Sequence, residues 1–192
     1  MDLLHKKTSI GNSFNKGEVS FGHARKVWRE QREVYPAGGV ITNVTDFLSE
    51  GMVPTGRPVI FDDKKKEILV LTTEMVLTIA GAESAEAFDA SKTYAVGDMV
   101  KKDSKTYKCI VAITEAAAWD ASKWEEVSVP DADLSDINGY LKEDSPIEDE
   151  NTICTGTVVK DGDIYEYMFD DEEAAILKAL PQKNGLKISF VN

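Results

Sequence analysis

Residues 57–71 read RPVIFDDKKKEILVL, two short apolar runs separated by a polar one. RPVIF predicts a strand, DDKKK a turn, and the continuously apolar EILVL a strand buried on both faces. Similar runs flank this stretch, with GGVITNV at 38–44 and MVLTIAG at 75–81. The pattern predicts a mainly β domain, either a small β-sandwich or a barrel-like sheet.

The C-terminal third repeats this texture. TICTGTVVK and DIYEYMF flank Asp161-Gly162, and a two-residue Asp-Gly step between apolar runs predicts a hairpin. DDEEAAILKAL (170–180) predicts a helix, with acidic residues in its first turn and Pro181 after its end. The alternating LKISFV (186–191) predicts a final strand paired into the sheet.

A separate unit interrupts this domain at residues 88–128. The small, polar GAESAEA (81–87) before it and SVPDADLS (128–135) after it are typical of linkers. Inside it, YAVGDMVKK and KTYKCIVAI predict two strands joined by an Asp-Ser turn, and the tetrapeptide DASK occurs at both 89–92 and 120–123. The chain therefore divides into an N-terminal arm (1–36), a β domain (37–80 plus 132–192) and an inserted β module (88–128).

Composition excludes several function classes. Asp and Glu number 34 against 22 Lys and Arg, a net charge of −12, which argues against binding to nucleic acid or to an anionic membrane surface. No apolar run reaches the roughly eighteen residues of a membrane span, and the start of the chain lacks the apolar core of a signal peptide. The fifteen acidic residues of 131–173, the 170–173 run included, are interpreted as a solvated face. For Glu148-Asp149-Glu150 calcium binding is the alternative, although EF-hand spacing is absent.

The arm has the opposite charge, with seven basic and four acidic side chains in residues 1–36. From Ser20 the spacing predicts a short helix that ends before Pro36. Such a helix is marginal alone and must dock, either on its own domain or on a partner. An aromatic face would form the anchor and a basic face its rim: Phe21, Trp28, Tyr35 and Arg25, Arg29, Arg32.

Catalytic and cofactor motifs are not found. His5 and His23 lie in the arm, and the sequence contains no HExxH, GxSxG, P-loop or GxGxxG motif. Cys109 and Cys154 are far apart in apolar runs, so we expect buried, free thiols and a reducing compartment. The sequence predicts no enzyme activity, no cofactor and no metal site.

Aromatic spacing within the module carries a first resemblance. Tyr94, Gly97-Asp98, Val100 and Tyr107, followed by Trp119 and Trp124, resemble the small β modules of chitin- and cellulose-binding type. Such modules are appended to chitinases and occur in phage head and tail proteins. The resemblance implies a glycan site among Trp119, Tyr94, Tyr107 and Trp124. We expect Trp119 to be an exposed stacking platform and the other three to be mostly core, with Phe88 at a position where relatives usually carry tryptophan.

The order of motifs in the surrounding domain carries a second resemblance. VPTGRPVIFD (53–62), DINGYLKEDSPI (136–147), TGTVVKDGDIYEY (155–167) and a short helix before LKISFV look like phage head decoration and head-fibre proteins. The resemblance implies a β-tulip-like, non-enzymatic protein on the outer surface of the virion capsid, bound to the major capsid protein. It also implies a homo-oligomer, with a trimer favoured, whose arm reaches the shell.

Two functions therefore compete. The first is a structural virion protein that decorates a capsid, or anchors a head fibre on it, and displays the module outward. The second is a non-catalytic protein whose main role is carbohydrate recognition, with surface glycans as its partners.

Overall fold

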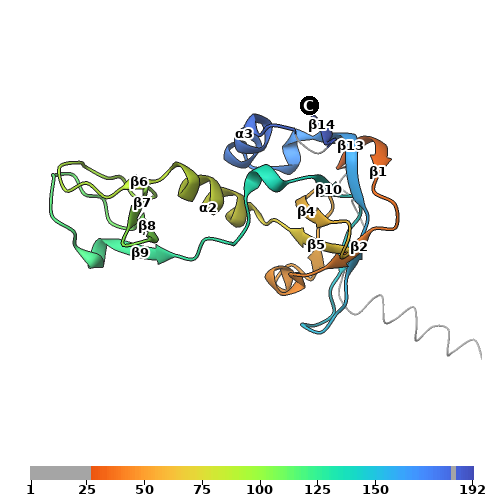
Figure 1. Cartoon of the computed structure of the whole chain (residues 1–192), viewed down its shortest axis with the longest axis horizontal. Helices are drawn as coiled ribbons and strands as arrows, with labels where there is room; N and C mark the ends of the chain where they lie inside the picture. The colour runs from red at the N-terminus through yellow and green to blue at the C-terminus, as the bar shows by residue number, and fades with distance from the viewer. Residues whose placement is uncertain (1–26, 183–184) are drawn as a thin grey trace, which may run out of the picture.

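The computed structural model describes residues 27–182 and 185–192, and it is mainly β, as predicted (Figure 1). No helix within these ranges is long and apolar enough to cross a membrane. The strands are β1 (Trp28–Val34), β2 (Gly39–Ile41), β3 (Met52–Val53), β4 (Pro58–Asp62), β5 (Glu67–Val70), β6 (Glu86–Ala87), β7 (Met99–Lys102), β8 (Lys105–Cys109), β9 (Trp124–Val127), β10 (Gly139–Leu141), β11 (Ser145–Pro146), β12 (Thr155–Gly156), β13 (Val158–Tyr165) and β14 (Lys187–Val191). The α-helices are α2 (Thr73–Ser84) and α3 (Asp171–Ala179), and 3-10 helices lie at Val44–Phe47, Ala121–Lys123, Leu134–Asp136 and Glu166–Met168.

The main sheet curls on itself. Its eight strands in the described residues follow the order β1-β13-β10-β4-β5-β2-β12, and β14 adds in parallel to β13. β1 continues into β2, and β12 continues into β13. The two continuous segments run antiparallel along each other, through the β1–β13 and β2–β12 pairs. The sheet therefore curls into a half-barrel, the barrel-like form expected from the sequence, and β1 has no second partner among the described strands.

An apolar core fills the inside of this curl. Ile68 and Val70 of β5 point into it, while Leu69 packs on the other side of the sheet, which confirms that EILVL is covered on both faces. The buried members of the inner core are Ile41, Val44, Phe47, Val53, Val59, Phe61, Ile68, Val70, Leu141, Ile147, Cys154 and Val158.

A second core lies between the outside of the sheet and helices α2 and α3. The predicted C-terminal helix is confirmed, and so is the final strand, since β14 pairs with β13 from Asp161↔Lys187 to Tyr165↔Val191. The buried members of the outer core are Val27, Trp28, Leu71, Val76, Ile79, Leu134, Ile137, Tyr140, Val159, Ile164, Phe169, Ala174, Leu177, Leu186 and Ile188.

A buried ion pair joins α3 to the sheet. Glu173, with 0% of its side chain exposed, forms an ion pair with Arg57, whose Nη2 lies 2.9 Å from Glu173 Oε1. Glu173 Oε2 accepts hydrogen bonds from Arg57 Nη1 at 3.3 Å and from the Thr73 hydroxyl at 2.9 Å. Arg57 Nε also donates to the Leu71 carbonyl at 2.9 Å. Glu173 is thus an exception among the acidic residues of the C-terminal third, which were expected on a solvated face.

The predicted hairpin at Asp161-Gly162 is wrong, because β13 runs straight through both residues. Gly162 is buried between β1 and β14, and a Cβ there would lie 2.7 Å from the Glu30 carbonyl oxygen and 3.2 Å from the Trp28 ring. This glycine is needed for the close approach of a neighbouring strand rather than for a turn.

The predicted strand at 75–81 is also wrong, because these residues belong to helix α2. Thr72 caps the helix by accepting a hydrogen bond from the Met75 amide at 3.1 Å, and Val76 and Ile79 share its buried face. Gly81–Ser84, predicted as part of a linker, form its last turn. A short apolar run cannot by itself distinguish a strand from a buried helix.

The helix predicted from Ser20 to Tyr35 is wrong over its second half, where β1 pairs along β13. Pairing with a long partner strand outweighs the helical spacing of aromatic and basic residues. The first half of that helix, with Phe21 and Arg25, lies outside the described residues.

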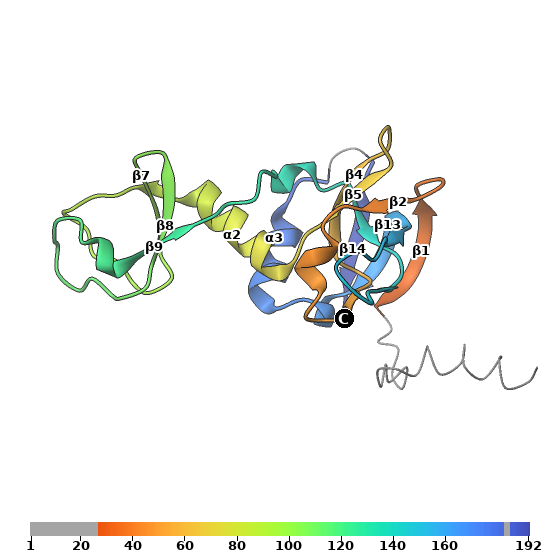
Figure 2. The ribbon, with the colours of Figure 1, turned by 90° about the horizontal axis from the view of Figure 1, so that it is seen from below.

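The module forms its own four-stranded sheet in the order β6-β7-β8-β9. We call the main sheet together with α2 and α3 the body. The module lies next to the C-terminal end of α2, on the side away from the main sheet (Figures 1 and 2). The chain enters the module from α2 and returns through residues 128–133. The predicted Asp-Ser turn is confirmed, because Asp103 (φ 50°) and Ser104 (φ 64°) join β7 to β8.

Candidate functional site

The aromatic side chains of the module gather into one cluster. Trp124 forms its centre with only 5% exposure, next to the buried Val100, Cys109 and Ile113. Four half-buried aromatic rings surround this centre: Phe88, Tyr94, Tyr107 and Trp119. A sheet this small has few aliphatic side chains to bury, so the aromatic rings supply most of its core.

Trp119 stacks on Trp124, with ring centroids 5.1 Å apart and planes inclined by 10°. Tyr107 meets Trp119 edge to face at 4.9 Å, and Lys102 Nζ lies 5.3 Å from the centroid of the Trp119 ring. Trp119, expected as an exposed platform, is half-buried among other rings, and Tyr107, expected to be mostly core, is also half-buried. What reaches solvent is a composite surface of Tyr107, Trp119 and Lys102, which we call the aromatic face.

Tyr94 has a structural position. Its hydroxyl accepts a hydrogen bond from the Asp89 amide at 2.8 Å and donates to the Asp89 carbonyl at 3.0 Å. Its ring packs on Phe88 and Trp124 at 5.6 and 5.1 Å. Trp124 is buried, as expected, and stacks on Trp119, while the half-buried Tyr94 is linked to the aromatic face through its contact with Trp124.

The Gly97-Asp98 step fixes the turn before β7. Gly97 has φ of +100°, which strongly favours glycine, and the Asp98 carboxylate accepts from the Ala95 amide at 2.7 Å. Next to this turn, the Gly97 amide donates to the Cys109 carbonyl at 2.8 Å. The motif is explained by backbone geometry and needs no ligand.

The two DASK tetrapeptides build the same turn. In the first, Asp89 accepts from the Ser91 amide at 2.8 Å and from the Ser91 hydroxyl at 2.7 Å. In the second, Asp120 accepts from the Ser122 amide at 3.1 Å and from the Ser122 hydroxyl at 2.7 Å. These hydrogen bonds lower the pKa of both carboxyl groups below the usual value.

Charged and aliphatic side chains complete the module's surface. Lys105 and Glu126 form an exposed ion pair at 2.7 Å across β8 and β9. Val96, Ile110 and Val111 are 64%, 45% and 50% exposed. Sequence reasoning missed these aliphatic residues because they lie within apolar runs that were interpreted as strands.

The arm residues that the structure describes belong to the body. Trp28 is buried and its Nε1 donates to the Thr55 hydroxyl at 3.2 Å, while Tyr35 packs edge to face on Phe61 at 5.1 Å. Arg29 and Arg32 are exposed on β1. For residues 28–35 the chain therefore docks on its own domain, the alternative that the charge pattern had left open.

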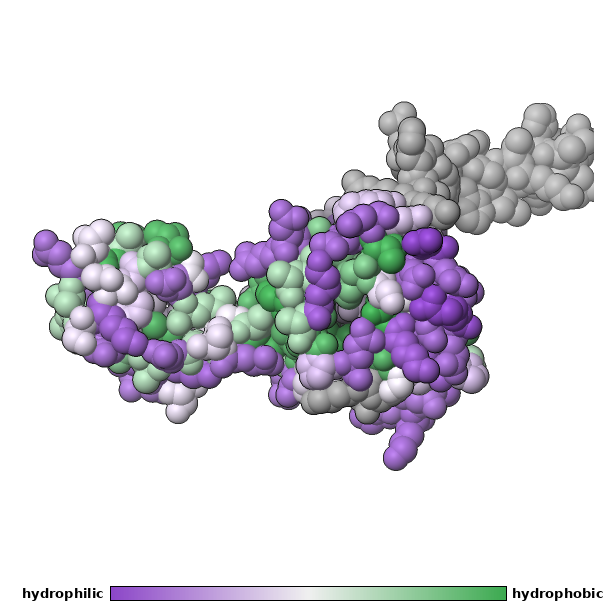
Figure 3. All heavy atoms as spheres, turned by 90° about the horizontal axis from the view of Figure 1, so that it is seen from above, coloured by the Kyte–Doolittle hydropathy of each residue, from purple (hydrophilic) through white to green (hydrophobic). Residues whose placement is uncertain are grey.

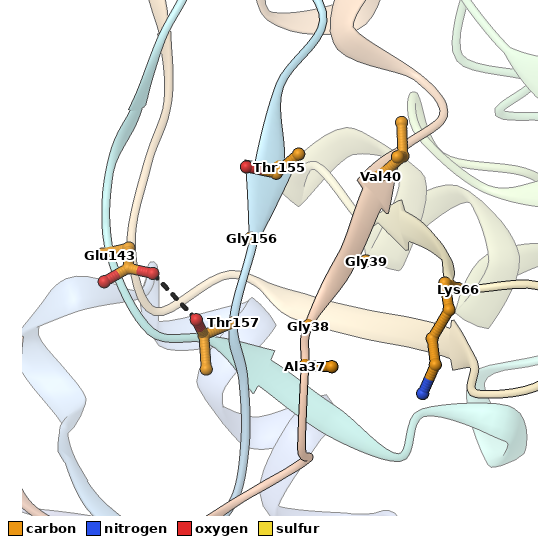
Figure 4. A pocket seen from close by; sticks show the side chains of 9 residues that line it. All are labelled: Ala37, Gly38, Gly39, Val40, Lys66, Glu143, Thr155, Gly156 and Thr157. Atoms are coloured by element: carbon orange, nitrogen blue, oxygen red, sulfur yellow. Dashed lines mark hydrogen bonds between the residues drawn. The ribbon is translucent and has the colours of Figure 1, made fainter.

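Two grooves lined by described residues contain no catalytic grouping. One, of about 390 Å³, is lined by Ala37–Val40, Lys66, Glu143 and Thr155–Thr157 (Figure 4). In this groove, the Glu143 carboxylate accepts a hydrogen bond from the Thr157 hydroxyl at 2.9 Å, and the Lys66 ammonium donates to the Asp63 carboxylate at 2.5 Å. Another, of about 1160 Å³, lies between α2 and β9.

The two cysteines, Cys109 and Cys154, form no disulfide within the described residues. Both are buried and free, as expected. Within residues 27–182 and 185–192, no group of His, Cys, Asp and Glu side chains could hold a metal ion.

Comparison with known proteins bears on the module alone. No curated protein and no solved structure matches the chain. One family model matches a segment that runs from the last residue of β6 through β7, β8 and β9 into the return segment toward the body. Residues 87–132 match Carbohydrate-binding module family 5/12, so the chain contains a module of carbohydrate-binding type.

Proposed function

We propose that this protein is a non-catalytic display protein, in which the β body anchors a carbohydrate-binding module to a larger assembly. The observation that carries the proposal is the arrangement in Figure 1, where the module lies beyond α2 with its aromatic cluster apart from both body cores. A module used only for folding would share a core with the body. A module that meets a polymer or a cell surface benefits from this separation.

The aromatic face provides the chemistry of sugar recognition. The C–H groups of a pyranose ring pack on an aromatic ring, and Tyr107 and Trp119 offer adjacent rings in an edge-to-face arrangement. Lys102, together with the Lys105–Glu126 pair, supplies donors and acceptors for sugar hydroxyls. Trp119 and Tyr107 would contact the sugar, while Tyr94 and Trp124 hold them in place.

Depletion from solution by particulate polysaccharides tests this role. The intact chain is mixed with chitin, cellulose or starch granules, and the protein that remains free is measured. We expect retention on chitin or cellulose above that on starch. Equal and negligible depletion by all three would contradict the proposal.

For the body, we propose attachment to the outside of a phage capsid through the major capsid protein. Support comes from the four motifs that resemble head decoration and head-fibre proteins. Their longest strands, β4, β10, β12–β13 and β14, belong to one sheet, and β11 of the second motif pairs with β3 beside it in a separate sheet. If the proposal holds, the protein resides on the virion surface.

Co-sedimentation with purified capsids tests this attachment. Removal of residues 1–26, which precede β1, should reduce capsid occupancy and leave the melting temperature of the body unchanged. Unchanged occupancy would show that the first 26 residues do not form the anchor. The absence of the protein from an inventory of purified particles would contradict attachment altogether.

A further inference from the structure

Strand β1 lies at the free edge of the main sheet. It pairs with β13 on one side, and no described strand pairs with it on the other. All its residues after Trp28 are exposed. Figure 2 shows β1 along the rim of the body remote from the module, and hydrophilic side chains dominate that end in Figure 3. An open edge of this kind can accept another strand.

The charges along β1 are self-complementary. The strand reads Trp28-Arg-Glu-Gln-Arg-Glu-Val34, so the charges on either side of Gln31 are positive, negative, then positive, negative. In an antiparallel pair of two such strands centred on Gln31, Arg29 lies opposite Glu33 and Glu30 lies opposite Arg32. Each opposed pair has opposite signs, which favours pairing, whereas like charges at those positions would oppose it.

Other alignments of the two strands place like charges together. A shift by one residue in one direction sets Arg29 against Arg32, and a shift in the other sets Glu30 against Glu33. A parallel, in-register pair sets every charge against itself. Charges on edge strands usually prevent pairing. Here their order permits a single antiparallel register among these alignments.

Ion pairs within the chain engage the charges at the C-terminal end of β1 and leave Arg29, near its N-terminal end, without a carboxylate partner in the described part of the chain. Arg32 is held by Asp161 at 2.6 Å, by Asp163 at 3.0 Å and by Glu30 of the same strand at 3.1 Å, and Lys160 bonds Glu33 at 2.6 Å. Arg29 has no carboxylate within 4.0 Å among the described residues. A partner strand would bring a carboxylate, its own Glu33, to that guanidinium.

We propose that β1 is a docking strand for a second copy of this chain, joined antiparallel about Gln31 into a two-fold dimer. Such an interface is isologous, because each copy contributes the same surface. It is an alternative to the trimer that the sequence resemblance implied. Because β1 lies at the end of the body remote from the module, the dimer carries its two modules at opposite ends. The proposal stands independently of what the modules bind.

Complementary charge reversals test the register. In Arg29→Glu, residues 29 and 33 are both acidic, and in Glu33→Arg both are basic. Each variant alone should associate at least about tenfold more weakly than wild type in sedimentation equilibrium at low salt. An equimolar mixture restores opposite charges at both positions and should regain dimers. Lys64→Glu and Glu148→Arg change the net charge equally at exposed sites away from β1 and should not affect association.

A cross-link provides a second measurement, one that does not depend on charge. Gln31→Cys places two thiols across the two-fold axis, and mild oxidation should yield a covalent dimer, whereas Thr93→Cys in the module should not. The native cysteines are buried. A wild-type protein that stays monomeric at all concentrations, a trimer, or a mixture that fails to regain dimers would each overturn the proposal. If a reversed variant fails to fold in a thermal melt, the Gln31→Cys cross-link alone decides.

Discussion

The indole of Trp119 lies flat against that of Trp124, with centroids 5.1 Å apart and an interplanar angle of 10°. One ring is buried at the centre of the module and the other reaches solvent. The stack therefore links the stability of the module to the surface proposed to bind sugar.

Truncation of the buried ring should be the more damaging change. We expect Trp124→Ala to destabilise the module by about 3–5 kcal/mol, because it removes a large side chain from a small core. Trp124→Phe should cost less, since it keeps a ring and removes an indole N–H that has no acceptor among the described residues. Chemical denaturation followed by tryptophan fluorescence and circular dichroism measures both, and a loss below about 1 kcal/mol for Trp124→Ala would show that the ring is not core.

The buried pair Arg57–Glu173 should respond asymmetrically to mutation. Glu173→Ala leaves a guanidinium only 12% exposed without its carboxylate, and we expect a loss of about 3–5 kcal/mol. The double variant Arg57→Met with Glu173→Ala should recover part of this loss, because no uncompensated charge remains. Denaturant midpoints of the single and double variants test the coupling. Strict additivity of the two single losses would argue against a coupled pair.

Gly162 should tolerate no side chain. In Gly162→Ala the new methyl group would meet the Glu30 carbonyl of β1 at 2.7 Å, a backbone atom that cannot move without breaking the strand pair. We expect a loss of about 1–3 kcal/mol and faster amide exchange along β1. Gly51→Ala, at a position with φ of +69° and no atom within 4 Å, is the matched control for backbone strain without a clash. If the β1 amides of Gly162→Ala exchange as slowly as those of the wild type, the close approach of β1 to residue 162 is contradicted.

Acid should loosen the two DASK turns. The pKa values of Asp89 and Asp120 are lowered by hydrogen bonds from Ser91 and Ser122, so the turns are fully stabilised above the ordinary aspartate pKa of about 4. That stabilisation is lost as the pH falls through the depressed values. The double variant Asp89→Asn, Asp120→Asn should flatten the fall of melting temperature in acid. Asp131→Asn, an exposed carboxylate outside the turns, should leave the profile as in wild type.

Much of the fold follows from local patterns, and the errors have a common cause. EILVL, the Asp103-Ser104 turn, α3 and the final strand were predictable because each is specified by its own residues. Gly162, the 75–81 helix and β1 were not, because long-range contacts decide them. Gly162 permits the approach of β1, and β13 draws residues 28–34 into a strand.

The candidate site was predictable in composition but not in exposure. Spacing alone identified the aromatic residues of the module. Whether Trp119 stands free or stacks on Trp124 depends on how the β8–β9 connection folds back, which no local pattern records. The charge order of β1 was visible in the sequence, yet it had no meaning until the strand and its free edge were known.

Binding of the intact chain to particulate chitin, compared between Tyr107→Ala and Tyr167→Ala, tests the central claim most directly. Tyr167 is a 62% exposed ring on the body, and Tyr107 belongs to the aromatic face. With thermal melts confirming that both variants are folded, we predict that Tyr107→Ala weakens binding by about 1–3 kcal/mol, by analogy with the stacking of bases on aromatic rings. Tyr167→Ala should bind as wild type does. Equal binding by the two variants, or weaker binding by Tyr167→Ala alone, would contradict a sugar site on the aromatic face.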